Sequence, residues 1–280
     1  MYRKIRFLLI LNCLAILSQA NAQFDDPKTI EVGPHVGLSY YMGDLNPTLP
    51  FAQAQLQYGG LVRYNYNNRW TFRFDYSRAT VKAYDEVVKW RPDRGLNFIS
   101  KINDFSLMAE FNFLEYYTGN PKKNVSPYIF GGISVFQYTA FADVDGTLVD
   151  LGDHLTEAEP ADQKWYDKMF GKTSPIGISI PFGMGVKFSL SRHMAATVEW
   201  MMHKTFTDYL DDVATVYPEQ HAIYTAEDGT EYDLTDPTGN FKAGQQRGNS
   251  AFNDWFGMAR MSLTWKFNLP DGRGCNLSKF

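Results

Sequence analysis

Eight segments of the sequence alternate between apolar and polar residues, and this alternation limits the fold more than any other feature. In the clearest segment, residues 69–76, four aromatic residues alternate with four polar ones. Successive side chains of a β-strand point to opposite faces, so this spacing indicates a strand with one apolar face. The eight segments are residues 31–40, 57–66, 69–76, 105–113, 128–138, 176–188, 196–203 and 257–267. We therefore predict an all-β protein with eight strands.

The connections between these segments distinguish a membrane barrel from a soluble β-sandwich. Short and long connections take turns along the chain, and most predicted strands have about ten residues, the length that a tilted strand needs to cross a bilayer. The short connections are 67–68, 115–124 and 191–192, and the long ones are 43–56, 81–101, 139–174 and 207–251. We predict a closed antiparallel transmembrane β-barrel over residues 23–268, with short periplasmic turns and long extracellular loops. A soluble lipocalin-like barrel is the alternative, because alternation does not distinguish inside from outside.

The chemistry of the two strand faces supports a barrel in lipid. In hydrocarbon every backbone polar group must be paired, so a sheet crosses a bilayer only when it closes. The apolar faces are expected to face lipid, including that of the fifth segment with Tyr128, Phe130, Phe136 and Tyr138. Aromatic residues near strand ends are expected to form interfacial girdles: Tyr40, Tyr41, Tyr58, Tyr66, Trp70, Tyr128, Tyr138, Trp255 and Trp265. Inward charges are expected to pair into a polar plug: Glu31, Arg63, Arg73, Asp75, Glu110, Lys187, Glu199, Arg260 and Lys266.

The first 22 residues have the features of a cleaved signal peptide. Three basic residues precede a short apolar run at 7–17, and Ala20-Asn21-Ala22 provides the small residues of a cleavage site. Beyond this run we find no apolar stretch of about 18 residues that would form a transmembrane helix. Cleavage would leave 24 Lys and Arg against 31 Asp and Glu, a net charge of −7, which argues against a nucleic-acid partner. Residues 269–280 are expected to form a periplasmic C-terminal tail.

Two polar segments lie where predicted strands meet long loops at the same rim. Asp44 and Asn46 follow the first strand, and Asp208, Asp211 and Asp212 follow the seventh. In a closed barrel both strands flank the eighth, so the two segments could meet and offer the oxygen ligands that Ca²⁺ prefers. The simpler interpretation is that these side chains cap nearby backbone in the loops. A third acidic stretch, residues 143–153, is interpreted as a solvated external loop.

Two other functions remain open from the residues alone. A lipid-modifying enzyme would need a histidine beside a nucleophile at the outer rim, and His203, with Ser250, is the candidate. A lone inward histidine is more often an ordinary hydrogen-bonding residue of the lumen. A surface receptor or adhesin would act through the loops at 139–174 and 207–251. The sequence contains neither a phosphate-binding loop nor a paired-cysteine metal site.

Several motifs resemble the PorG-like (DUF6089-type) outer-membrane proteins of Bacteroidetes. They comprise Gly43-Asp44-Leu45 within 41–47, the hairpin from Arg63 to Trp70, the segment Phe206-Thr207-Asp208-Tyr209-Leu210-Asp211-Asp212-Val213, and the tail from Arg273 to Phe280. The resemblance implies a barrel of the type IX secretion system that contacts a periplasmic ring, built from a lipoprotein and its partner subunit. It implies outer-membrane lipid and lipopolysaccharide as surroundings, and no catalytic residues or cofactor. Many members of the family have no assigned role.

Overall fold

The computed structural model describes residues 28–154, 156–157, 176–249 and 252–269. The expected signal peptide, residues 1–22, and the tail beyond Leu269 lie outside this range. No helix within the described residues is long and apolar enough to cross a membrane.

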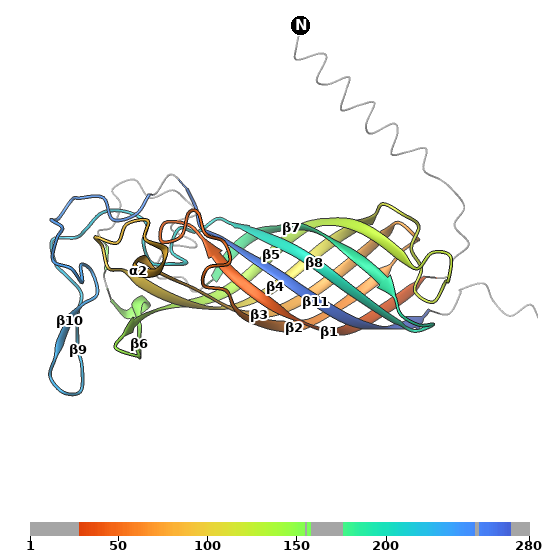
Figure 1. Ribbon diagram of the computed structural model, residues 1–280, viewed down its shortest axis with the longest axis horizontal. Coiled ribbons are helices and arrows are strands. Elements are labelled where there is room, and N and C mark those ends of the chain that lie inside the picture. The colour runs from red at the N-terminus through yellow and green to blue at the C-terminus, as the bar shows by residue number, and fades with distance from the viewer. Residues whose placement is uncertain (1–27, 155, 158–175, 250–251, 270–280) are drawn as a thin grey trace, which may run out of the picture.

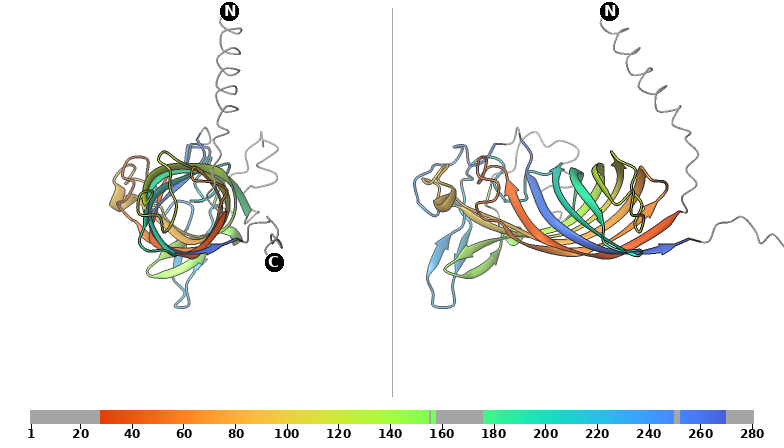
Figure 2. Two further views of the ribbon diagram at one scale, coloured as in Figure 1. Left: turned by 90° about the vertical axis from the view of Figure 1, so that its right-hand side faces the viewer. Right: turned by 45° about the vertical axis from the view of Figure 1, so that its right-hand side comes forward.

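Eight long strands of the described chain close into one ring, which Figure 2 shows end-on. Each strand is antiparallel to both neighbours, and the ring closes where β4 pairs with β5 and β1 pairs with β11. The ring strands are β1 (Thr29–Met42), β2 (Gln55–Asn65), β3 (Trp70–Tyr84), β4 (Asn97–Asn112), β5 (Val125–Val144), β7 (Ile176–Ser189), β8 (Met194–Thr205) and β11 (Trp255–Asn268). The prediction of a closed eight-stranded antiparallel barrel is confirmed.

The outer surface of the ring is apolar, as a wall in contact with lipid requires. Leu107 is 56% exposed and Met261 is 59% exposed, while the neighbouring Ser106 and Ser262 are buried in the lumen. On β5 the outward apolar residues extend from Val125 to Val135, which corresponds to about 25 Å along the barrel axis at the usual strand rise and tilt. This height matches the apolar band of a transmembrane barrel.

The prediction for the fifth segment was wrong about which face meets lipid. Its aromatic residues point into the barrel, where Phe136 is fully buried, whereas Ile133 on the other face is 65% exposed. Tyr128 and Tyr138 therefore line the lumen and do not belong to an interfacial girdle. Both faces of this segment are apolar, so the sequence could not show which face points toward lipid and which toward the lumen. Tyr41, also assigned to a girdle, is likewise buried inside.

Three strands continue well beyond the lipid-facing band. β5 has 20 residues, which gives about 50 Å along the barrel axis for a strand tilted by roughly 40°. The link expected at 81–101 is correspondingly shorter, because β3 ends at Tyr84 and β4 begins at Asn97. At this end lie α2 (Asp85–Val88), β6 (Thr147–Asp150), η1 (Leu151–Asp153) and the hairpin β9 (Ile223–Thr225) and β10 (Glu231–Asp233) (Figure 1). We call it the loop end, and the opposite end the turn end.

Part of the stretch expected to be a solvated loop at 143–153 is ordered secondary structure. β5 and β6 pair as a hairpin whose two turn residues, Asp145 and Gly146, have φ angles of 50° and 86°. An Asp-Gly pair favours this turn because both positions require positive φ. The hairpin projects outward from the barrel at the loop end (Figure 1).

Candidate functional site

A network of buried charges fills the middle of the lumen. Its members come from six strands, so it ties opposite walls of the barrel together: Arg63 of β2, Arg73 and Asp75 of β3, Glu110 of β4, Lys187 of β7, Glu199 of β8 and Arg260 of β11. All seven side chains are almost completely shielded from solvent. The prediction that inward charges would pair is confirmed for these seven residues, whereas Glu31 and Lys266 each bind Thr118 by a hydrogen bond instead.

Glu199 is a carboxylate of this network that contacts three arginines. It accepts hydrogen bonds from Arg260 Nε at 2.5 Å and from Arg73 Nη1 at 2.7 Å, and also from the Tyr128 hydroxyl. A second carboxylate, Glu110, lies 2.6 Å from the Lys187 ammonium group. Because these contacts cross the lumen, they leave the barrel interior filled by side chains, as expected for eight strands.

The turn end of the lumen is closed by the connection between β4 and β5. The Lys266 ammonium group donates to the carbonyl oxygen of Thr118, and the Thr118 hydroxyl donates to Glu31 at 2.5 Å. The backbone N–H of Gly119 donates to the Ser189 hydroxyl at 2.7 Å. Residues 116–119 therefore fold across the end of the barrel and hold strands β1, β7 and β11 together.

At the loop end the two family-motif segments meet, as their positions in a closed barrel predicted. The Tyr41 hydroxyl donates to the carboxyl group of Asp211 and lies 2.6 Å from Asp254 Oδ1. Asp254 also accepts the backbone N–H of Leu210 at 3.0 Å. Sequence reasoning did not assign Tyr41 or Asp254 to this site. The sequence could have indicated Asp254 as a member of this site, because Asp254 directly precedes the last strand at the same rim.

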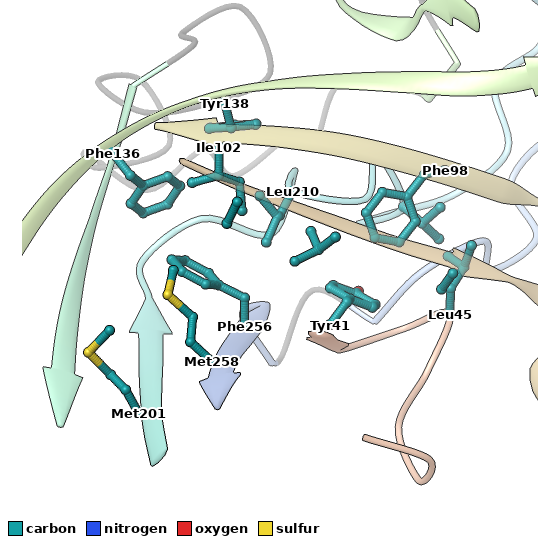
Figure 3. Close-up of a cluster of buried hydrophobic side chains, with 14 of the residues drawn as sticks. Tyr41, Leu45, Phe98, Ile102, Phe136, Tyr138, Met201, Leu210, Phe256 and Met258 are labelled. Carbon is teal, nitrogen blue, oxygen red and sulfur yellow. The ribbon is translucent and has the colours of Figure 1, made fainter. Parts of the chain in front are cut away.

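Apolar residues of the same motifs close the loop end of the lumen. Leu45 and Leu210 are fully buried and pack with Phe98, Ile102 and Phe256 in one cluster (Figure 3). The Leu210 side chain comes from the long connection after β8, so this connection enters the mouth of the barrel. The charged middle of the lumen is thereby covered by an apolar layer at the loop end.

The acidic residues at the loop end hold their protons unusually tightly. Burial, reinforced by the charge of Asp254 and its neighbours, raises the pKa of Asp208 to about 11. Burial also raises the pKa of Asp254 to about 7 and that of Asp211 well above its ordinary value. Asp44 is a further member of this group of carboxyl groups, and burial raises its pKa as well. Its carboxyl group accepts the Asn249 backbone N–H at 2.5 Å. These carboxyl groups raise one another's pKa, and neither carboxyl oxygen of Asp208 has a hydrogen-bond partner among the described residues.

The remaining two calcium candidates bind other protein groups: Asn46 binds the local backbone and Asp212 binds a distant side chain. Asn46 Nδ2 donates to the carbonyl oxygens of Tyr41 and Leu49, and Asn46 Oδ1 accepts the Leu49 N–H at 3.0 Å. The Asp212 carboxyl group accepts the hydroxyl of Thr156. Within the described residues, no group of three or more His, Cys, Asp or Glu side chains is arranged to hold a metal ion. The contacts of Asn46 correspond to the loop-capping interpretation.

Thr207 and Gly43 shape the two motif segments. Thr207 Oγ1 accepts the Tyr209 N–H at 3.2 Å, which forms a local turn at the start of the segment. Gly43 and Asn46 exchange two backbone hydrogen bonds, of 3.3 and 3.1 Å, so the chain turns back directly after β1.

His203 does not lie at an accessible rim. Its side chain is completely buried in the lumen, where the ring stacks on Phe256 with centroids 4.2 Å apart. His203 Nδ1 lies 3.0 Å from the Ser179 hydroxyl and 3.7 Å from Asp104 Oδ1, so both neighbours approach the same ring nitrogen. In a catalytic triad, one ring nitrogen of the histidine faces the nucleophile and the other faces the orienting carboxylate. The arrangement around His203 differs from this. Ser250, its expected partner, lies outside the described residues.

The fold and the filled lumen define the class of this protein as an outer-membrane-type β-barrel of eight strands. The profile of DUF6089, a domain of unknown function, matches residues 5–158, and the chain belongs to this family. No curated protein matches the sequence significantly.

Several solved outer-membrane barrels resemble the structure at low sequence identity. OprG from Pseudomonas aeruginosa is 9% identical, with a TM-score of 0.42, and the match covers 88% of this chain and 98% of that one. Neisserial surface protein A is 12% identical, with a TM-score of 0.39 and coverage of 86% and 97%. The N-terminal β-barrel domain of P. aeruginosa OprF is 12% identical, with a TM-score of 0.37 and coverage of 85% and 97%.

Proposed function

We propose that this protein is a sealed, non-enzymatic barrel that anchors other proteins at the outer membrane. The observation that supports this most strongly is the triple closure of the lumen. Paired charges fill the middle, the turn at 116–119 crosses one end, and the Leu210 segment enters the other. Other molecules can contact a barrel closed in this way at its two ends and its outer wall. The side chains of its interior stabilise the fold.

We further propose that the anchored assembly belongs to type IX secretion. The resemblance of the Gly43–Leu45 and Phe206–Val213 segments to PorG-like proteins supports this role, and membership of DUF6089 is consistent with it. The partners would be the periplasmic ring lipoprotein and its partner subunit. Both ends of the described chain lie at the turn end, where Leu269 N–H donates to the Lys28 carbonyl at 3.1 Å. This end would therefore face the periplasm.

The turn end offers a small surface for such contact. Leu114 lies just past the end of β4 and is 55% exposed, and the exposed Pro121 and Lys122 lie in the same connection. The Leu114 backbone exchanges two hydrogen bonds with the Ser126 hydroxyl, so Leu114 lies at the edge of the lipid-facing band, where an exposed apolar side chain can contact a protein. The tail at 270–280, which lies outside the described residues, would add to this surface.

Site-specific cross-linking in native membranes tests this assignment. A photo-reactive amino acid at Lys122 should capture ring subunits, because the side chain projects from the turn end. The matched control is Glu227, which is exposed in the β9–β10 connection at the loop end and should capture none. Absence of ring subunits at Lys122, or equal capture at both positions, would reject the secretion role while leaving the sealed barrel intact.

A surface receptor is the second candidate, favoured by the hairpin β9–β10. This hairpin projects from the loop end (Figure 1), and Ile223 on it is exposed. Deletion of residues 223–233 should abolish binding of cells or surface ligands if the loop end is a receptor. Unchanged binding would end this alternative.

A further inference from the structure

The outer wall of β3, β4 and β5 changes character abruptly at one level. The last fully apolar row across these strands consists of Tyr76, Phe105 and Val135, which are register partners. The next outward row toward the loop end pairs Arg78 of β3 with Asn103 of β4, and Asn103 with Gln137 of β5. Lipid-facing wall thus gives way to polar wall within one step of two residues.

Three cations occupy this polar wall. Arg78, Lys101 and Lys82 stand in three successive outward rows, since Lys101 pairs with Thr80 and Lys82 pairs with Ile99. We call these three residues the basic patch. At the usual rise and tilt of barrel strands they lie about 5, 10 and 15 Å beyond the apolar row. The headgroup region begins where the hydrocarbon ends, and long basic side chains can turn toward it.

The charges of the basic patch have no carboxylate counterparts. In the described chain, none of the three side chains forms an ion pair, whereas Arg63, Arg73, Arg260 and Lys187 in the lumen all do. Lys101 instead lies over the Phe141 ring at 4.8 Å from its centroid, and Lys82 over Tyr84 at 5.6 Å.

The nearest carboxylate on the outward face of these strands already has partners. Asp143 lies one outward row beyond Lys82, where it accepts the Tyr84 hydroxyl at 2.8 Å, and its backbone binds the side chain of Asn97. The patch therefore keeps its positive charge on a protein whose formal net charge is −4.

We propose that the basic patch binds the phosphate groups of an anionic lipid in the leaflet at the loop end. The acyl chains of this lipid would pack against Tyr76, Phe105 and Val135, and its phosphates would contact Arg78 and Lys101 first. Two observations select a membrane lipid over a soluble anion. The patch is continuous with the lipid-facing wall, and its cations are stacked along the membrane normal across the depth of a headgroup. The inference is independent of the secretion role.

Lipid titrations followed by native mass spectrometry test this proposal. The probes are a diphosphorylated lipid A and its dephosphorylated form with the same acyl chains, added to the purified protein in detergent. The parent protein should bind the phosphorylated lipid much more tightly. Each cation near a membrane surface contributes roughly a fivefold factor to anionic-lipid binding, so replacing three should weaken it by on the order of 100-fold. The test variant is R78Q/K82Q/K101Q.

A charge-matched control separates the patch from net charge. The variant K122Q/R192Q/K242Q removes three exposed cations elsewhere on the surface and should bind lipid like the parent. Heat-modifiable gel mobility checks folding, and if the triple variant fails to fold, R78Q and K101Q alone should each weaken binding roughly fivefold. Equal binding of both lipid forms by the parent would overturn the proposal, as would parent-like binding by a folded patch variant.

Discussion

Replacing Glu199 by Gln should destabilise the barrel much more than removing a charge from an exposed loop. The amide keeps the size of the side chain but removes the charge that faces Arg73 at 2.7 Å and Arg260 at 2.5 Å. In the described lumen, the four cations of the network would then share two carboxylates, Asp75 and Glu110. Removing one partner of a buried ion pair costs about 3–5 kcal/mol, because the remaining charge stays buried without compensation. We expect a loss of this size in the free energy of unfolding.

Denaturant unfolding in phospholipid vesicles, followed by tryptophan fluorescence, measures this loss. The control E219Q removes a charge from an exposed loop and should change stability by less than about 0.5 kcal/mol. The double variant E199Q/R73M also removes a cation, and should therefore be more stable than E199Q alone. A loss below about 1 kcal/mol for E199Q, or a double variant no better than the single one, would refute the view that paired charges organise the lumen.

Three further predictions concern the lumen, the loop end and the outer wall. The protein in planar bilayers should show no steady ion conductance, and a reproducible open channel would contradict the closure of the lumen. Asp208 and Asp254 hold protons in the folded state that the unfolded chain releases near pH 4, so the unfolding midpoint should fall as pH rises from 5 to 9. The variant D208N should flatten this dependence, and a midpoint that rises with pH would refute the assignment. Arg in place of Met261, in the apolar band, should cost about 2–4 kcal/mol of unfolding free energy, while Arg at exposed Gln137 should cost little.

The sequence predicted the barrel well because alternation and connection length are local properties. On β11, Met261 and Leu263 alternate with Ser262 and Thr264, and the structure places these pairs on opposite faces as expected. On β5 the same reasoning failed, because Ile133 and Phe136 lie on different faces and both faces are apolar. For such a strand, packing across the lumen determines which face points inward, and a local sequence pattern does not contain that information.

The candidate site was predictable in position but not in chemistry. The order of strands in a closed ring was enough to bring Asp44 and Asp211 to one rim. It could not show that the Tyr41 hydroxyl would bridge Asp211 and Asp254, or that Asn46 would turn back onto Leu49. These outcomes depend on side-chain rotamers and burial, which the spacing of residues does not encode.

A nitroxide scan along β11 in lipid vesicles tests most directly whether the apolar face of the wall meets lipid. Single cysteines between Ala259 and Trp265, in a chain whose Cys13 and Cys275 are replaced by serine, would carry the label. Labels at Met261 and Leu263 should collide freely with oxygen dissolved in the bilayer, whereas labels at Ser262 and Thr264 should be shielded from both oxygen and a water-soluble quencher. A scan without this two-residue period, or with the period reversed, would contradict the account.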